Sequence, residues 1–209
     1  MRCVYTCNLD DFSDADILPA HQNLRRQSTF SRYLLFFALI YGKNGEFKNI
    51  SRCEIMRSME KIKDMMHEFG WEKSKHGKPF PRGLALDENC RYFSLSHSKN
   101  IAAVCVSDEN IGIDVQAIDE HTDIKRLLKI AERVRSDEEH IADFSRKQFY
   151  RWWTGKEAAC KLDGRGISVL SQIKIQHDSF KIQQKSGFLQ SRFIDINDQK
   201  AWLTTAWYQ

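Results

Sequence analysis

Apolar residues recur with a helical period in three separate regions of this 209-residue chain. Residues 31–41 are apolar at almost every position, and residues 50–68 place apolar side chains three or four apart, so both predict helices. Residues 123–142 continue this period. Within them, Ser136 and Glu139 have the spacing of an N-terminal capping box, which predicts that a helix begins at Ser136.

Elsewhere the apolar pattern is typical of strands. Serines alternate with large apolar residues over 92–98, and short apolar runs bounded by turn residues cover 101–106 and 111–115. Residues 3–9 predict one more strand, and residues 169–209 predict three or four antiparallel strands. Since helical and strand patterns both occur and the strands run in consecutive hairpins, we predict an α+β fold.

Residues 149–162 predict a helix with an unusual mixture of side chains. Large apolar residues form a stripe, and Lys156, Glu157 and Lys161 lie among them. Glu157 and Lys161 are four residues apart, so they share one face of the helix. On this stretch alone, a partly buried helix with a solvated Glu–Lys pair is the favoured interpretation.

Composition narrows the class of protein. The chain is 42% hydrophobic and 29% charged, which is typical of a soluble globular protein with a sizeable core. Its net charge of +4 is scattered, so we expect no nucleic-acid partner. It carries neither an apolar run long enough to span a membrane nor a secretory signal. We therefore expect a cytoplasmic protein whose six cysteines are reduced.

Asp114 interrupts the apolar strand predicted at 111–115. A buried carboxylate is costly unless it has a partner or a metal. Asp114 and Gln116 point to the same side of a strand, and their oxygens suit Mg2+. An aspartate that caps the following turn is an equally good interpretation of this stretch.

Three groups of polar residues suit a polyphosphate substrate. They are Asp114 at its strand end, Glu157 and Lys161 on their helix, and the serines and histidine at 96–98. Lys78, on a predicted turn, adds a positive charge to the third group. The chain has neither a P-loop nor a Gly-x-Gly-x-x-Gly motif. A Ser–His hydrolase is disfavoured, because adjacent residues cannot easily form a nucleophile–base pair and no Gly-x-Ser-x-Gly elbow is present.

The order of these motifs resembles the 4'-phosphopantetheinyl transferase superfamily, most closely its longer, two-lobed type. The motifs are Gly-Lys-Pro at 77–79, Phe-Ser-Leu-Ser-His-Ser at 93–98, Gly-Ile-Asp-Val-Gln at 112–116, Trp-Thr-Gly-Lys-Glu-Ala-Ala-Cys-Lys at 153–161 and Gly-x-Gly at 164–166. Residues 133–139 resemble the helix and loop that the family carries before its last motif.

The resemblance implies two pseudo-symmetric lobes, each a small antiparallel sheet packed with a long helix, which we assign to residues 1–110 and 111–209. It implies an enzyme of the holo-[acyl-carrier-protein] synthase type. Such an enzyme moves the phosphopantetheine arm of coenzyme A to a serine of an apo acyl or peptidyl carrier protein and releases 3',5'-ADP. We expect a monomer. The alternative is a non-catalytic relative that binds CoA or a carrier protein.

The resemblance also implies residue roles. Asp114, Gln116 and Glu157 would hold Mg2+, and Lys161 would stabilise charge on the pyrophosphate. Either Glu157 or a metal-bound water would take the serine proton. The residues expected to bind CoA are Lys78, Pro79, Ser96, His97, Lys156, Arg25, Arg26 and Arg32. Gln116 departs from the pattern, because many relatives carry glutamate there, and it keeps the non-catalytic alternative open.

Overall fold

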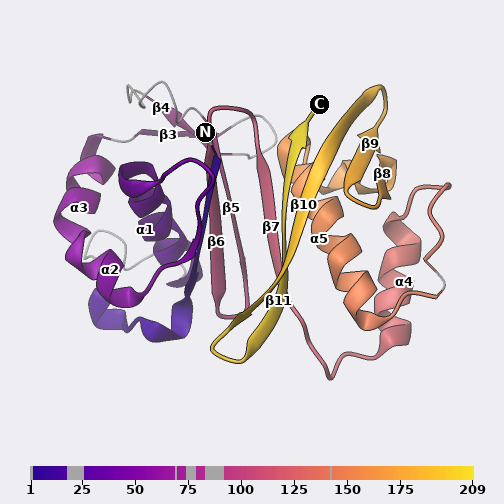
Figure 1. The fold of residues 1–209 in the computed structure, drawn as a ribbon, viewed down its shortest axis with the longest axis horizontal. Coiled ribbons are helices and arrows are strands. Elements are labelled where there is room, and N and C mark those ends of the chain that lie inside the picture. Colours follow the sequence, from indigo (N-terminus) through magenta and orange to yellow (C-terminus); the bar gives the residue numbers. More distant parts are fainter. Residues whose placement is uncertain (1, 18–25, 69, 74–78, 83–91, 142) are drawn as a thin grey trace.

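Two sheets lie face to face, and helices cover the outer face of each (Figure 1). The structure is a computed structural model, and it describes residues 2–17, 26–68, 70–73, 79–82, 92–141 and 143–209. The first sheet has the order β2-β1-β6-β5 and the second β7-β11-β10-β9-β8. Apart from the parallel pair β1–β2, all neighbouring strands in these sheets are antiparallel. The predicted α+β class is confirmed.

The first half of the chain forms the first sheet and its helices. Its elements are β1 (Arg2–Asn8), α1 (Arg26–Tyr41), β2 (Phe47–Asn49), α2 (Arg52–Arg57), α3 (Met59–Glu68), the small pair β3 (Gly70–Lys73) and β4 (Pro79–Arg82), β5 (Tyr92–Ser98) and β6 (Ile101–Ser107). Short 3-10 turns follow β1 at Leu9–Asp11 and Asp14–Asp16.

The second half forms the second sheet and its helices. Its elements are β7 (Gly112–Ala117), α4 (Ile124–Val134), α5 (Arg146–Asp163), a 3-10 segment (Ile167–Gln172), β8 (Ile173–Gln176), β9 (Ser179–Ile182), β10 (Lys185–Ile196) and β11 (Gln199–Tyr208). The division of the chain into lobes at residues 110 and 111 stays a prediction.

Strand β6 explains why its sequence is a continuous apolar run. All seven of its residues are buried, because α1 packs on one face and the second sheet on the other. Ala102, Val104 and Val106 face the helices, whereas Ile101 and Cys105 face the second sheet. The apolar core therefore continues from one sheet to the other, and the two halves of the chain form one packed body.

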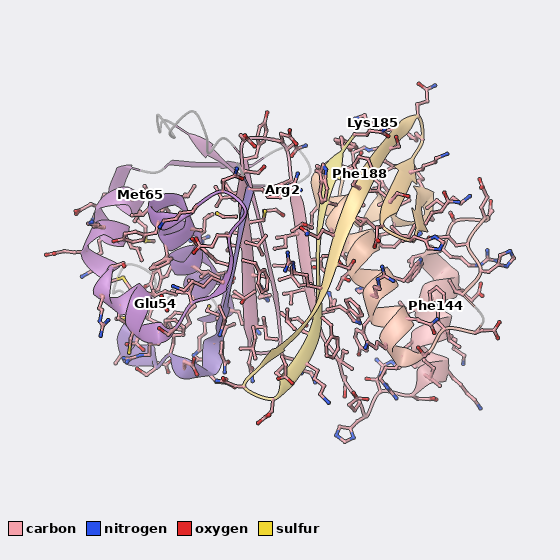
Figure 2. All side chains as sticks on the ribbon, in the orientation of Figure 1. Arg2, Glu54, Met65, Phe144, Lys185 and Phe188 are labelled. Atoms are coloured by element: carbon pink, nitrogen blue, oxygen red, sulfur yellow. The ribbon has the colours of Figure 1, made fainter. Side chains whose placement is uncertain are left out.

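A cation–aromatic contact also joins the two sheets. The guanidinium carbon of Arg2, which lies on β1 and is labelled in Figure 2, is 3.7 Å from the ring centroid of Trp207 on β11. Such a contact contributes about 0.5–2 kcal/mol, depending on how much water it excludes. It adds to the apolar packing between the halves.

Three helix predictions were wrong in their extent. The pattern at 50–68 forms two helices, because the chain leaves the helical conformation at Ser58. The helix predicted for 123–142 ends at Val134, and the helix predicted to begin at Ser136 is absent from the described residues. The Ser136 amide does donate to Glu139 Oε2 over 2.8 Å. However, Glu139 turns into the protein interior, where other donors bind it.

Candidate active site

Asp114 lies where the edges of the two sheets meet. It belongs to β7, and its side chain is 2% exposed. Oδ1 accepts from Ser96 Oγ at 2.7 Å and from Lys161 Nζ at 2.8 Å, and Oδ2 accepts from Gln116 Nε2 at 3.0 Å. These three donors come from β5, α5 and β7. They stabilise a carboxylate that would be costly to bury alone.

Helix α5 delivers Glu157 and Lys161 to Asp114. It begins with a capping box between Ser145 and Gln148, and it ends at Gly164, whose φ of 81° closes the last turn. Glu157 and Lys161 project from one face, as their spacing predicts. The ion pair of Lys161, however, is with Asp114 and not with Glu157 within the same helix.

Gly112 allows α5 to approach β7 closely. A Cβ atom at this position would lie 2.0 Å from the carbonyl oxygen of Ala158 and 2.7 Å from the amide nitrogen of Leu162. Neither contact is possible between real atoms, so another residue at position 112 would push the helix away from the strand. The glycine two residues before Asp114 thus helps to bring Lys161 within reach of the carboxylate.

The charges of the site act on one another. Loss of water raises the pKa of Glu157, the Asp114 carboxylate raises it further, and the Lys161 ammonium opposes both. The pKa of His97, on β5, is lowered by loss of water and then by Lys161. The cluster contains two carboxyl groups, Asp114 and Glu157, and one ammonium, Lys161, so a bound cation would relieve the repulsion between the two acids.

Serine hydroxyls of β5 join the two sheets beside this site. Ser94 Oγ accepts from the amide of Ile113 at 3.0 Å, and Ser98 Oγ accepts from the amide of Ala117 at 3.0 Å. Ser96, between them, donates to Asp114. We call Ser94, Ser96 and Ser98 the serine seam. The sequence pattern placed Ser98 with Ser96 and His97 near a polyphosphate substrate and gave Ser94 no role, although serines two residues before and two residues after Ser96 are the signal that could have found the seam.

The donor set fits Mg2+. Two carboxylates and an amide supply hard oxygen ligands, the type that Mg2+ prefers. In the described part of the chain, no three His, Cys, Asp or Glu side chains gather as a metal site, so the third ligand from the protein would have to be of another type. Gln116 is adjacent, but it turns its amide nitrogen toward Asp114. Its amide group would have to rotate by half a turn to offer the oxygen.

Lys156 does not join this cluster, which corrects its expected role beside the CoA phosphates. Its side chain is fully buried and forms an ion pair with Glu139 at 2.6 Å. Its ammonium also donates to the carbonyl oxygens of Val134, Leu170 and Ile173. Because protein groups already occupy every N–H of this ammonium, it cannot bind a phosphate while this network is intact.

Of the remaining residues expected to bind CoA at the start of the chain and in residues 78–79, the structure describes the side chains of Arg26 and Arg32. Arg26 donates to the carbonyl oxygens of Leu9 and Phe12, so its guanidinium holds the turn after β1. Arg32 is a partly buried residue of α1. Pro79 begins β4, whose backbone alone is described. Arg25 and Lys78 lie outside the described residues.

The fold and site together define a class: a two-lobed α+β protein with a carboxylate–ammonium cluster where its sheets meet. Comparison with known proteins relates the second half of the chain to one family. Residues 110–207 match the model of the 4'-phosphopantetheinyl transferase superfamily, and this stretch contains Asp114, Gln116, Glu157 and Lys161. Over these 98 of its 209 residues, the chain is therefore similar to this superfamily.

Three curated relatives agree with this assignment. The chain is 35% identical over 109 residues to the 4'-phosphopantetheinyl transferase HetI of Nostoc sp., covering 50% of this chain and 46% of the relative. It is 34% identical over 110 residues to the 4'-phosphopantetheinyl transferase psf-1 of Bacillus pumilus, covering 49% of this chain and 43% of the relative. It is 32% identical over 105 residues to the 4'-phosphopantetheinyl transferase gsp of Aneurinibacillus migulanus, covering 47% of this chain and 40% of the relative. The matched stretch thus spans less than half the length of each relative.

Proposed function

We propose that this protein transfers the 4'-phosphopantetheine arm of CoA to a serine hydroxyl of an apo acyl or peptidyl carrier protein. The observation that carries this proposal is the convergence of Asp114, Glu157 and Lys161 where the two sheets meet. A pyrophosphate bound there would meet an ammonium that is already oriented by a buried carboxylate.

The reaction forms one P–O bond and breaks another. The serine oxygen of the carrier attacks the phosphorus that bears the pantetheine arm, and the anhydride bond to 3',5'-ADP breaks. Lys161 would neutralise charge on the departing phosphate, because its side chain is 30% exposed and so can be reached by a ligand. Glu157 would accept the serine proton, directly or through a water, since loss of water and Asp114 raise its pKa.

Asp114 and Glu157, with Gln116 after rotation of its amide, would hold Mg2+, which would draw negative charge from the pyrophosphate oxygens. Ser96 and His97 would then lie along the bound CoA, with His97 facing its 3'-phosphate. His97 is exposed, so a ligand could reach its imidazole. The net charge of +4 favours association with an acidic carrier protein.

Several finer features belong to the same proposal. They are the holo-[acyl-carrier-protein] synthase type of specificity, a monomeric state, a cytoplasmic location, and the absence of membrane and nucleic-acid partners. One observation bears on the membrane: among the described residues, no helix is both long and apolar enough to cross one.

A non-catalytic relative that binds CoA or a carrier protein is the second candidate. Gln116 favours it, because a neutral amide adds no charge to the metal site. The intact Asp114, Glu157 and Lys161 favour catalysis. The two candidates differ in one outcome, since only the transferase modifies its carrier.

The decisive experiment incubates the full chain with CoA, Mg2+ and a panel of apo carrier proteins, followed by mass spectrometry of the carriers. We expect a phosphopantetheine mass on at least one carrier and none on a carrier whose acceptor serine is alanine. Lys161→Met should lower the rate by at least about tenfold, because it removes the charge from the departing phosphate. CoA binding without any mass shift across the panel would support the non-catalytic candidate instead.

A further inference from the structure

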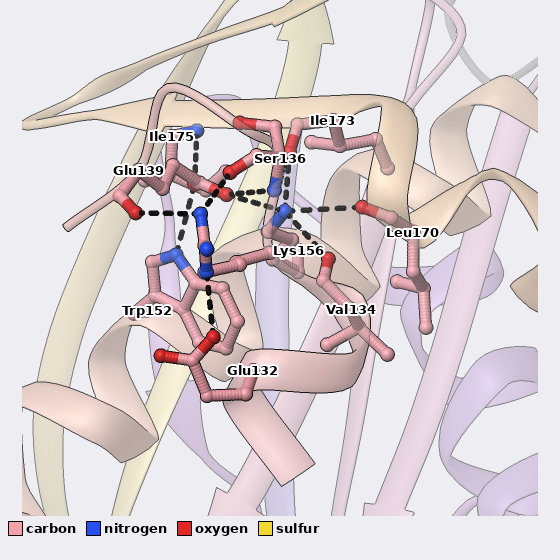
Figure 3. Close-up of polar contacts among 10 residues, drawn as sticks. Glu132, Val134, Ser136, Glu139, Trp152, Lys156, Leu170, Ile173 and Ile175 are labelled. Atoms are coloured by element: carbon pink, nitrogen blue, oxygen red, sulfur yellow. Dashed lines mark hydrogen bonds and ion pairs between the residues drawn. The ribbon is translucent and has the colours of Figure 1, made fainter. Parts of the chain in front are cut away.

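A buried ion pair lies on the side of α5 that faces away from Asp114. Lys156 and Glu139 are 0% and 4% exposed, and their Nζ and Oε2 atoms are 2.6 Å apart (Figure 3). Glu139 belongs to the loop between α4 and α5, so the pair joins a helix to a loop 17 residues earlier in the chain. The ring of Trp152 lies beside the ammonium, with its centroid 5.0 Å from Nζ.

Hydrogen bonds satisfy both members of the pair. Glu139 accepts from Trp152 Nε1 at 2.9 Å, from the amide of Ile175 at 2.7 Å and from the amide of Ser136 at 2.8 Å, in addition to Lys156. The three carbonyl oxygens that Lys156 binds belong to the end of α4, the 3-10 segment and β8. We call Lys156 and Glu139 with these partners the α5 anchor.

The α5 anchor connects α5 to α4, to the loop that follows α4, to the 3-10 segment and to β8. Figure 3 shows its contacts converging on the ammonium and the carboxylate from α4, the following loop and the start of β8. A fully satisfied network of this kind resists both rotation and sliding of the helix, because either motion would leave buried polar groups without partners.

We propose that Lys156 and Glu139 are positioning residues, which fix the rotation of α5 so that Glu157 and Lys161 are held against Asp114. Lys156 and Glu157 are consecutive, so they point about 100° apart around the helix axis and their directions are coupled. This inference rests on the proposed function for its effect on turnover, but its structural consequence can be tested without turnover.

The geometry sets the size of the effect. The side-chain tips of a helix lie about 5–6 Å from its axis, so a rotation of 10° displaces them by about 1 Å. A displacement of about 1 Å in a reacting group can lower a rate about 100-fold. A small rotation of α5 is therefore sufficient to impair the site while the protein remains folded.

The test compares Lys156→Met and Glu139→Gln with Asp16→Asn as a matched control. Asp16 and Arg52 form another ion pair with a buried carboxylate, which is 4% exposed, but in the half of the molecule that lacks α5. All three variants should lose stability, because each disrupts a hydrogen-bonded charge pair. Glu139→Gln retains the shape of the side chain and serves where Lys156→Met does not fold.

Three readouts separate positioning from general stability. With each variant shown to be folded, Lys156→Met and Glu139→Gln should lower kcat at least about tenfold and weaken Mn2+ binding in calorimetry at least about threefold, whereas Asp16→Asn should change neither by more than about twofold. The third readout needs no metal and no substrate. The pKa of His97, followed by NMR, should rise toward its ordinary value in the anchor variants, because Lys161 moves away.

The inference is overturned if folded anchor variants keep the wild-type pKa of His97, or if Asp16→Asn changes the readouts as much as they do. The proposed function fails separately. If the wild-type protein modifies no carrier and binds no Mn2+, the His97 readout still decides whether the α5 anchor positions Lys161.

Discussion

Removing one hydroxyl from the serine seam should weaken the contact between the two sheets. Ser94 is buried, and its Oγ is the acceptor for the amide of Ile113, a residue with no exposed surface. In Ser94→Ala this amide loses its acceptor while its surroundings stay apolar. A buried donor without a partner costs about 1–3 kcal/mol, so we expect the free energy of unfolding to fall by that amount.

Urea unfolding at 25 °C measures this change, and thermal unfolding should show a Tm lower by about 2–10 °C for a chain of this size. Ser186→Ala is the control, because Ser186 bonds Gln209 at an exposed position. It should alter stability by less than about 0.5 kcal/mol. If Ser94→Ala is as stable as this control, the hydroxyl–amide bonds do not hold the two sheets together.

Three further predictions address the metal site, acid stability and the close approach of α5. Gln116→Glu should strengthen Mn2+ binding in calorimetry, because it places a second carboxylate beside Asp114. The same change should destabilise the metal-free protein, because the two carboxylates repel each other. Unchanged Mn2+ affinity would mean that residue 116 is not a ligand. The Arg52 guanidinium lowers the pKa of Asp16 to about 2, so this pair stabilises the protein above about pH 4 and its contribution should disappear between about pH 4 and pH 2 in acid titrations, but not in Asp16→Asn. Gly112→Ala should lower the free energy of unfolding, measured in urea, by at least about 3 kcal/mol, because its Cβ would clash with α5. Gly45→Ala is the control: no atom lies within 4 Å of the added Cβ, so only the positive φ should lower the free energy of unfolding, by about 1 kcal/mol. Equal losses in the two variants would exclude a clash with α5.

The sequence predicts those helices and strands whose pattern of apolar residues follows directly from which of their faces are buried. Strand β6 is an uninterrupted apolar run because both its faces are covered, and α5 carries a clear stripe with caps at both ends. Strand β7 was likewise predicted from a short apolar run, and strands β8 to β11 from apolar residues that recur at the spacing of strands. Local periodicity was sufficient wherever one face of an element decides its conformation.

The predictions failed where long-range partners decide. Ser136 and Glu139 have the spacing of a helix start, but Lys156, Trp152 and Ile175 supply stronger partners for the Glu139 carboxylate from elsewhere in the chain. A single sequence does not show that the carboxylate of Glu139 will form an ion pair with a buried ammonium 17 residues later. The same holds for Lys156, which adjoins a site residue and has a different role.

The two lysines of α5 differ in which acid each one meets. Lys156 forms an ion pair with Glu139 on the far side of the helix, and Lys161 forms one with Asp114 where the two sheets meet. Glu157 lies between them in sequence, yet its pKa is raised, because loss of water and then the Asp114 carboxylate outweigh the effect of Lys161. Had Lys156 faced the seam, the two carboxylates and two ammoniums would have balanced, and a metal ion would gain little there. Because Lys156 is anchored elsewhere, one negative charge is left over among Asp114, Glu157 and Lys161, and this excess is what would attract a divalent cation and, with it, a pyrophosphate.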